Sequence, residues 1–272
     1  MKKVDRFKSY MKNSEQLFSC PICAASMVVD DNHIVCKQNH SFDIAKKGYI
    51  NMMTQPVHTK YDKDLFEARY QFIQHGVYKP LHDKISELIG QRQSVIDLGC
   101  GEGSHLAKIT ELVNHDMIRA GLDIAKEGVM TASKYHLDAI WCVGDLAQVP
   151  FKDSSFDVVL NILSPANYGE FKRLLSDDGF VIKVFPNSGY LKELREAFYN
   201  NEEYSNEETK KRFKESLCDI QEERLTYQAP ISAELVPFLL KMTPLTWNLN
   251  ERVDLELKEV TVDVDILVGR GG

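Results

Sequence analysis

The hydrophobic pattern changes its period along the chain, and each period predicts a different element. Apolar and polar residues alternate in "MVVDDNHIV", residues 27–35, which predicts a hairpin around an Asp-Asp-Asn turn. Further along, helical spacing predicts two helices separated by Gly76. The apolar faces of these helices consist of Phe66, Tyr70 and Ile73, and of Leu81, Ile85, Leu88 and Ile89.

A short apolar run at residues 95–98 predicts a buried strand, and a glycine-rich turn follows it directly. The turn contains Gly99, Gly101 and Gly103 in "DLGCGEG". After it, helical spacing predicts a helix whose apolar face carries Leu106, Ile109, Leu112 and Val113. A strand, a glycine-rich turn and the start of a helix are typical of nucleotide-binding α/β folds.

Composition and charge restrict the class of protein. With 272 residues and 43% hydrophobic content, the chain can bury one substantial core and a small satellite domain. No apolar run approaches the roughly 20 residues of a membrane span, and none near the start resembles a signal peptide, so a cytoplasmic location is expected. The net charge of −7 argues against a polyanionic partner, but residues 1–94 carry 14 Lys and Arg against 10 Asp and Glu. The first third is therefore the part that can meet phosphate.

Four residues near the N-terminus have the spacing of a zinc site. Cys20 and Cys23 form a C-x2-C pair, Cys36 follows after twelve residues, and His40 follows after three more. Two close pairs of nitrogen and sulfur ligands suit tetrahedral Zn²⁺, and a complete set of four predicts a structural site. His33 is a competing ligand, but it lies within the hairpin between the two pairs. Because so small a module has little core of its own, metal binding should supply much of its folding energy.

Acidic residues around the glycine turn point to the cofactor. Asp123 ends the next apolar run, about twenty residues after the glycines, where an acidic residue can accept hydrogen bonds from ribose hydroxyls. NAD enzymes share that feature, and a simple helix cap is an alternative role for Asp123. Asp97 and Glu102, however, resemble the acidic positions of the glycine motif in class I S-adenosylmethionine-dependent methyltransferases.

Later segments resemble the same superfamily. "AIWCVGDLAQVPF" resembles its third strand, and Asp145 the residue that contacts adenine, although a turn residue is the alternative for Asp145. "FDVVLNILSP" resembles the fourth strand and the loop facing the transferable methyl group, and "LLSDDGFVIKVFP" resembles a helix, a turn and the fifth strand. "ERLTYQAPI" and "EVTVDVDILVGR" would complete a seven-stranded, Rossmann-like α/β sheet.

Several quoted pieces together resemble one family, the 23S ribosomal RNA guanine-N1 methyltransferases. They are "CPIC" with its C-x3-H partner, "SFDIAKKGY", "EARYQFIQHGVYKPL", "IDLGCGEG", "SFDVVLNILSP" and "MTPLTW". The resemblance implies methylation of N1 of a guanine in a hairpin of 23S rRNA, with S-adenosyl-L-methionine as cofactor and a structural Zn²⁺. It also implies a homodimer whose zinc domains flank an RNA-binding cleft.

The sequence pattern and the two resemblances together give an expected division of the chain and an expected set of site residues. Residues 1–42 would form an N-terminal arm and zinc module, 43–93 a packed helical connector, and 94–272 the methyltransferase domain. Residues 1–16 extend beyond the usual start of the family and are expected to form a flexible arm. The expected zinc ligands are Cys20, Cys23, Cys36 and His40. The expected cofactor contacts are Tyr78, Asp97, Gly99, Gly101, Glu102, Gly103, Asp123, Asp145 and Tyr190.

The sequence names no single catalytic residue. The loop "NILSPANY" as a whole is expected to face the guanine, and its candidates are Asn161, Ser164, Pro165 and Tyr168. Aromatic residues that could stack on an exposed base are Tyr168, Phe185 and Trp247, and lysines that could contact phosphate are Lys37, Lys46, Lys47 and Lys60.

Two other functions remain open from the sequence. One is a methyltransferase for a small metabolite in which the zinc module is a structural lid, which the acidic second part of the chain favours. The other is a non-catalytic RNA-binding or assembly factor that kept the fold, against which the intact glycines and Asp123 argue.

Overall fold

A computed structural model describes residues 2–198, 205–243, 246 and 255–272. Within these residues, one mixed sheet has the strand order β1-β2-β3-β4-β7-β6-β5-β8-β9-β11-β10. The strands are β1 (Met27–Asp30), β2 (His33–Cys36), β3 (Ser41–Ala45), β4 (Tyr49–Asn51), β5 (Ser94–Leu98), β6 (Ile118–Asp123), β7 (Ile140–Val143), β8 (Phe156–Ile162), β9 (Leu175–Pro186), β10 (Cys218–Pro230) and β11 (Glu259–Arg270). The helices are α1 (Lys3–Asn13), α2 (Lys63–Gln74), α3 (Lys79–Ile89), α4 (Ser104–Glu111), α5 (Lys126–Tyr135), α6 (Tyr168–Leu174), α7 (Lys192–Phe198), α8 (Glu207–Ser216) and α9 (Val236–Met242).

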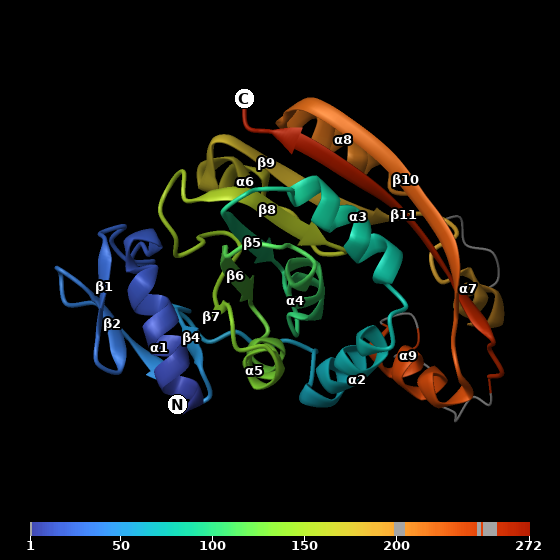
Figure 1. The fold of residues 1–272 in the computed structure, drawn as a ribbon, viewed down its shortest axis with the longest axis horizontal. Coiled ribbons are helices and arrows are strands. Elements are labelled where there is room, and N and C mark those ends of the chain that lie inside the picture. Colours follow the sequence, from blue (N-terminus) through green and yellow to red (C-terminus); the bar gives the residue numbers. More distant parts are fainter. Residues whose placement is uncertain (1, 199–204, 244–245, 247–254) are drawn as a thin grey trace.

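The seven strands from β7 to β10 form the predicted seven-stranded sheet. Strands β7, β6, β5, β8 and β9 are parallel, whereas β11 is antiparallel to both of its neighbours, β9 and β10. The long β10–β11 pair lies at one end of the sheet (Figure 1). Both strands that the sequence assigned to the end of the chain are therefore confirmed.

The N-terminal strands extend this sheet at its other end. The predicted hairpin is confirmed, because β1 and β2 pair antiparallel around the turn at residues 31 and 32. Strand β3 follows β2, and β4 pairs in parallel with β7 through Ile50 opposite Cys142. The cysteine-rich segment is thus joined to the larger domain by the backbone pairing of β4 with β7, and β4 lies beside β7 in Figure 1.

The first residues are helical, and the expected flexible arm is wrong for the described residues 2–16. Helix α1 buries Phe7 and Met11 against the N-terminal strands and the adjoining part of the sheet. At its far end, the Tyr10 hydroxyl donates to the carbonyl of Met117, 3.2 Å away. A helix with one apolar face folds onto a surface that can bury that face. The few isolated apolar residues in this part of the sequence did not reveal such a face.

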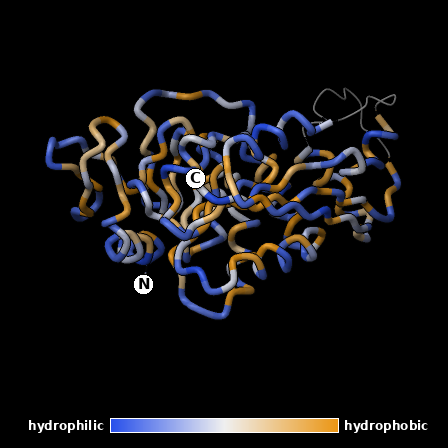
Figure 2. Tube along the Cα trace, turned by 90° about the horizontal axis from the view of Figure 1, so that it is seen from above, coloured by the Kyte–Doolittle hydropathy of each residue, from blue (hydrophilic) through white to orange (hydrophobic). Residues whose placement is uncertain are grey.

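Two apolar layers cover the two faces of the sheet, because successive side chains of a strand point to opposite sides. Val95 and Val158 contact the layer under α2 to α5, whereas Ile96 and Val159 contact the layer under α6, α8 and α1. Figure 2 shows the apolar stretches gathered along the strands in the middle of the molecule. The expectation that Leu112 belongs to the apolar face of the helix after the glycine turn is wrong. Helix α4 ends one residue before Leu112, and this residue is 44% exposed.

The predicted helices on either side of Gly76 are confirmed as α2 and α3. Among the described residues, no helix combines the length and the apolar character that crossing a bilayer requires.

Candidate active site and metal centre

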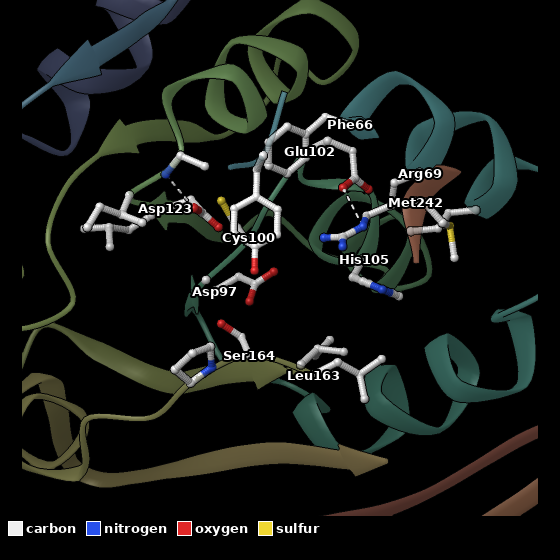
Figure 3. Close-up of a pocket in the computed structure, with 18 of the residues that line it drawn as sticks. Phe66, Arg69, Asp97, Cys100, Glu102, His105, Asp123, Leu163, Ser164 and Met242 are labelled. Atoms are coloured by element: carbon white, nitrogen blue, oxygen red, sulfur yellow. Dashed lines mark hydrogen bonds and ion pairs between the residues drawn. The ribbon is translucent and has the colours of Figure 1, made fainter. Parts of the chain in front are cut away.

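A cavity of about 490 Å³ opens at the carboxyl ends of β5, β6, β7 and β8 (Figure 3). In a parallel sheet these ends meet at one edge, where the loops that follow the strands surround a ligand site. Most of the predicted cofactor residues lie on the wall of this cavity, namely Tyr78, Asp97, Gly99, Glu102, Asp123, Asp145 and Tyr190. Gly101 and Gly103 belong to the same turn but are not part of the wall.

The glycine turn after β5 is closely packed on both sides. Gly99 has φ +85°, and a Cβ atom there would lie 1.8 Å from Oγ of Ser164. Gly103 has φ +76°, and a Cβ atom there would lie 2.4 Å from the ring of Trp141. Glycine is therefore required at both positions, by the left-handed backbone and by the close approach of neighbouring side chains. The first lets the loop after β8 reach the turn, and the second lets α4 start against β7.

Asp123 holds the turn and faces the cavity at the same time. One carboxylate oxygen accepts a hydrogen bond from the Gly101 amide and the other from the Ala125 amide, both at 2.8 Å. Asp145 similarly accepts from the Ala147 amide at 2.8 Å while lining the cavity. The local capping role and the ligand-facing position are thus compatible, because a carboxylate has about four lone-pair sites.

Two buried carboxylates on the cavity floor each have one oxygen without a donor. Asp97 Oδ1 and Glu102 Oε1 have no hydrogen-bond partner among the described residues, and both side chains are buried. Burial, reinforced by the charges of Asp123 and Glu102, raises the pKa of Asp97 to about 8. Buried polar atoms normally have partners. The floor is therefore suited to a ligand that brings hydrogen-bond donors or positive charge.

Arg69 on α2 provides the positive charge of the cavity and was not predicted. Its Nε lies 3.8 Å from Oε2 of Glu102, and its guanidinium lies over the ring of Phe66. Figure 3 shows Arg69 and Phe66 entering the cavity from the same side. Their spacing of three places Arg69 on the predicted helical face of Phe66, and that spacing was the available sequence signal.

The buried tyrosines and the histidine on the wall are uncharged near neutral pH. The Tyr78 and Tyr190 hydroxyls, distant in sequence, lie 2.7 Å apart. His105 forms a 2.9 Å hydrogen bond with His82, and burial lowers the pKa of both imidazoles, that of His82 to about 4. Arg69 is consequently the only cationic side chain on the described part of the wall near neutral pH.

The loop after β8 contributes only some of its candidate residues to the cavity. Ser164 and Pro165 line it, whereas Asn161 and Tyr168 do not. The Asn161 amide is buried and donates to the Pro165 carbonyl at 2.9 Å and to the Leu98 carbonyl at 2.5 Å. Asn161 thus fixes the loop against the strand that precedes the glycine turn.

Lys183 on β9 is a second residue that the sequence did not reveal. It lies opposite Asn161 in the parallel pair, and its ammonium donates to Asn161 Oδ1 and to the Ser164 carbonyl, the latter at 2.7 Å. Burial lowers its pKa to about 8. Its bond occupies the Ser164 carbonyl, one of the polar groups expected to face a substrate. A lysine inside an apolar strand gives no sign of such a role, because the partner depends on strand register.

The four predicted metal ligands converge. Ligand atoms of Cys20, Cys23, Cys36 and His40 all lie within 4.8 Å of one another. The Sγ atoms of Cys23 and Cys36 are 3.7 Å apart, and His40 Nδ1 lies 3.4 Å from Cys20 Sγ and 3.6 Å from Cys36 Sγ. Zn–S bonds of about 2.3 Å in a tetrahedron require a separation of about 3.8 Å between sulfur atoms, so this donor set fits zinc. His33 lies outside the cluster and faces Asp30.

Comparison with known proteins decides the family. The family "RlmA, N-terminal" matches residues 18–63, and "Methyltransferase domain" matches residues 95–179. "Putative 23S rRNA (guanine-N(1)-)-methyltransferase YxjB" of Bacillus subtilis (strain 168) is 43% identical over 93% of this chain and 96% of its own. The chain belongs to the 23S rRNA (guanine-N1)-methyltransferase family.

Another member of this family is similar over a shorter stretch. The "23S rRNA (guanine(748)-N(1))-methyltransferase" of Streptomyces fradiae is 31% identical over 68% of this chain and 69% of its own. Among solved structures, the YcgJ protein of Bacillus subtilis aligns with a TM-score of 0.46 and 19% identity, over 73% of this chain and all of that one. The chain is thus an S-adenosylmethionine-dependent methyltransferase with a zinc-binding segment.

The cavity fits the cofactor of this family. S-adenosylmethionine carries a cationic sulfonium and ammonium, one carboxylate and two ribose hydroxyls. The unpartnered oxygens of Asp97 and Glu102 match its donors and cations, and Arg69 is available for its carboxylate. When bound, the cofactor supplies an activated methyl group on sulfur.

Cofactor affinity is expected to rise with pH, because Asp97 should bind cations only when ionised. With a pKa of about 8 in the cofactor-free protein, Asp97 is mostly neutral below that pH. Calorimetric titration between about pH 5.5 and about pH 7.5 should show tightening by up to about tenfold per pH unit, with proton release. Asp97→Asn should remove most of that slope, and an equal slope in both proteins would contradict the assignment.

Replacing Lys183 by Met should impair methyl transfer more than cofactor binding. The change leaves the buried Oδ1 of Asn161 and the half-buried carbonyl of Ser164 without their donor, at a cost of about 1–3 kcal/mol for the buried acceptor. We expect kcat to fall about 10- to 100-fold and the S-adenosylmethionine Kd to change less than about threefold. Lys172→Met, at an exposed lysine of α6, is the matched control. Parallel losses of kcat and of affinity would point to general disruption instead.

Proposed function

We propose that this protein methylates N1 of a specific guanine in a hairpin loop of 23S rRNA, with S-adenosylmethionine as the methyl donor. The observation that carries the proposal is the near full-length similarity to a relative named for this activity, spanning both the zinc segment and the methyltransferase domain. The protein would act in the cytoplasm as a homodimer. In each subunit, residues 1–42 would form the zinc module, residues 43–93 the connector and residues 94–272 the catalytic domain.

Different residues of the cavity would contact different groups of the cofactor. Asp123 would accept hydrogen bonds from the ribose hydroxyls, and Asp145 would lie beside the adenine. Asp97 and Glu102 would face the cationic end of the methionine moiety, and Arg69 would pair with its carboxylate. Tyr78, Tyr190 and Gly99 would shape the remaining wall, and Gly101 and Gly103 would complete the turn behind it. Charge and hydrogen-bonding capacity support this division, since the wall offers a complementary side chain for each of these cofactor groups.

The guanine would enter over Ser164 and Pro165. Its Watson–Crick edge is available only when the base is unpaired, so a loop nucleotide or an extruded base is needed. Alignment of sulfur, methyl carbon and N1 can lower a barrier by about 7–11 kcal/mol in favourable cases. Lys183 and Asn161 would keep the loop in place for that alignment. Tyr168 packs against Phe171 and Phe213 rather than facing the cavity, and Trp247 lies outside the described residues.

A direct assay separates this proposal from its alternatives. Purified protein and labelled S-adenosylmethionine would be incubated with unmethylated 23S rRNA, or with a total metabolite extract. Incorporation into rRNA, at a position mapped by a primer-extension stop, is the expected result. Label confined to the metabolites would favour a small-molecule methyltransferase, and absence of cofactor binding in calorimetry would favour a non-catalytic RNA-binding factor.

A further inference from the structure

A second concave site lies on the outer side of α2 and α5, away from the cofactor cavity. This hollow of about 390 Å³ is bordered by α1, the β3–β4 turn, α2 and α5. Five lysines from four separate segments converge on it, and we call them the lysine groove: Lys3, Lys46, Lys47, Lys63 and Lys134. In Figure 1, α1 and β4 lie beside α5 at this end of the molecule.

The lysine groove has a strong local excess of positive charge. Of the residues that the structure describes, only two acidic ones, Glu67 and Glu127, border it, although the whole chain has a net charge of −7. Lys134 is paired with Glu67 at 2.7 Å. Lys46, Lys47 and Lys63, by contrast, form no ion pair with any carboxylate in the part of the chain that the structure describes.

The lysines also act on one another. The ammonium of Lys3 donates to the backbone carbonyl of Lys134 at 2.7 Å, which holds the Lys3 side chain at the end of α5 that carries Lys134. Burial and the charge of Lys134 lower the pKa of Lys3. Like charges gathered in a hollow repel, and an anionic ligand would relieve that repulsion.

The groove is held in a fixed position relative to the cofactor cavity. On α2, Phe66 and Arg69 face the cavity while Lys63 and Glu67 border the groove. Helix α1, which carries Lys3, is tied to the larger domain by an ion pair of Arg6 with Asp138. A chain bound in the groove would therefore lie at a constant distance from the reacting methyl group.

We propose that the lysine groove binds backbone phosphates of the RNA substrate, at a fixed distance from the nucleotide that enters the cavity. This inference rests on the proposed function for the identity of the RNA. Lysine ammonium groups bind phosphates as point charges without reading sequence. Contacts from four rigid segments would set the register of the RNA, while the cavity selects the base.

The test uses the full-length protein and a 23S rRNA fragment at several salt concentrations. The groove variant is Lys46→Ala/Lys47→Ala/Lys63→Ala, and the matched control is Lys172→Ala/Lys211→Ala/Lys258→Ala, at exposed lysines outside the groove. Each phosphate contact contributes about 0.7–0.9 to the slope of log Kd against log salt. The groove variant should therefore lose about 2 from that slope and bind at least about tenfold more weakly at low salt.

Three further measurements make the outcome decisive. Both triple variants should keep the wild-type S-adenosylmethionine Kd and thermal midpoint, and Lys46→Arg/Lys47→Arg/Lys63→Arg should restore RNA binding. Equal affinity and slope in the groove and control variants would overturn the inference. Inorganic phosphate that binds in the groove without weakening rRNA binding would overturn it as well. If wild-type protein binds the rRNA through the groove but transfers no methyl group to it, the proposed function fails and the groove assignment stands.

Discussion

Replacing Cys23 by Ser is expected to release zinc and to weaken RNA binding by at least about tenfold, while the S-adenosylmethionine Kd changes by less than about threefold. The four ligands join the turn at residues 20–23 to the end of β2 and the start of β3. Structural zinc contributes an apparent 10–16 kcal/mol in zinc-finger peptides at neutral pH, so its loss should unfold the turns that it holds. The cofactor cavity contains no residue of this segment.

The size of the effect on the rest of the protein depends on shared packing. Cys20 and Cys36 lie in the same apolar layer as residues of the large sheet, and Phe18 packs on Phe151 with ring centroids 5.0 Å apart. Some destabilisation should therefore spread to the sheet, and the thermal midpoint should fall. Cys218→Ser is the matched control, since Cys218 is exposed on β10. Zinc content, RNA affinity and cofactor affinity would be measured on both variants, and equal loss of both affinities would indicate global unfolding.

Local chemistry made the metal ligands and the glycine turn predictable. The ligand spacing of Cys20, Cys23, Cys36 and His40 is imposed by two tight turns and a hairpin, all of which depend on neighbouring residues. The strand, turn and helix around Gly99 are likewise contiguous. Wherever a feature is built from residues close in sequence, pattern and spacing carry enough information to place it.

Features that depend on distant segments were not predictable in this way. Arg69 enters the cavity because α2 packs beside the glycine turn, and Lys183 meets Asn161 because β9 pairs in register with β8. The parallel pairing of β4 with β7 joins residues about ninety positions apart and turns an expected satellite module into an extension of the sheet. Strand register and helix packing fix these contacts, and neither is set by a local period.

Replacing Asp123 by Ala is expected to weaken S-adenosylmethionine binding by about 100-fold or more. Hydrogen bonds to a charged group contribute about 1.5–3 kcal/mol each, and two ribose hydroxyls would lose theirs together. Calorimetry on the purified variant measures the change directly. Asp177→Ala, which removes an exposed carboxylate from the turn within β9, is the matched control for loss of one negative charge.

The same substitution should change the stability of the cofactor-free protein much less, because two effects of opposite sign accompany it. The amides of Gly101 and Ala125 lose their acceptor, which costs about 1–3 kcal/mol per buried group. Against this, Asp97 loses the neighbouring negative charge of Asp123, which helps to raise its pKa. A large loss of affinity with a nearly unchanged thermal midpoint would support the ribose contact. An unchanged affinity would exclude it, and a matching collapse of both would show that Asp123 serves mainly to hold the glycine turn.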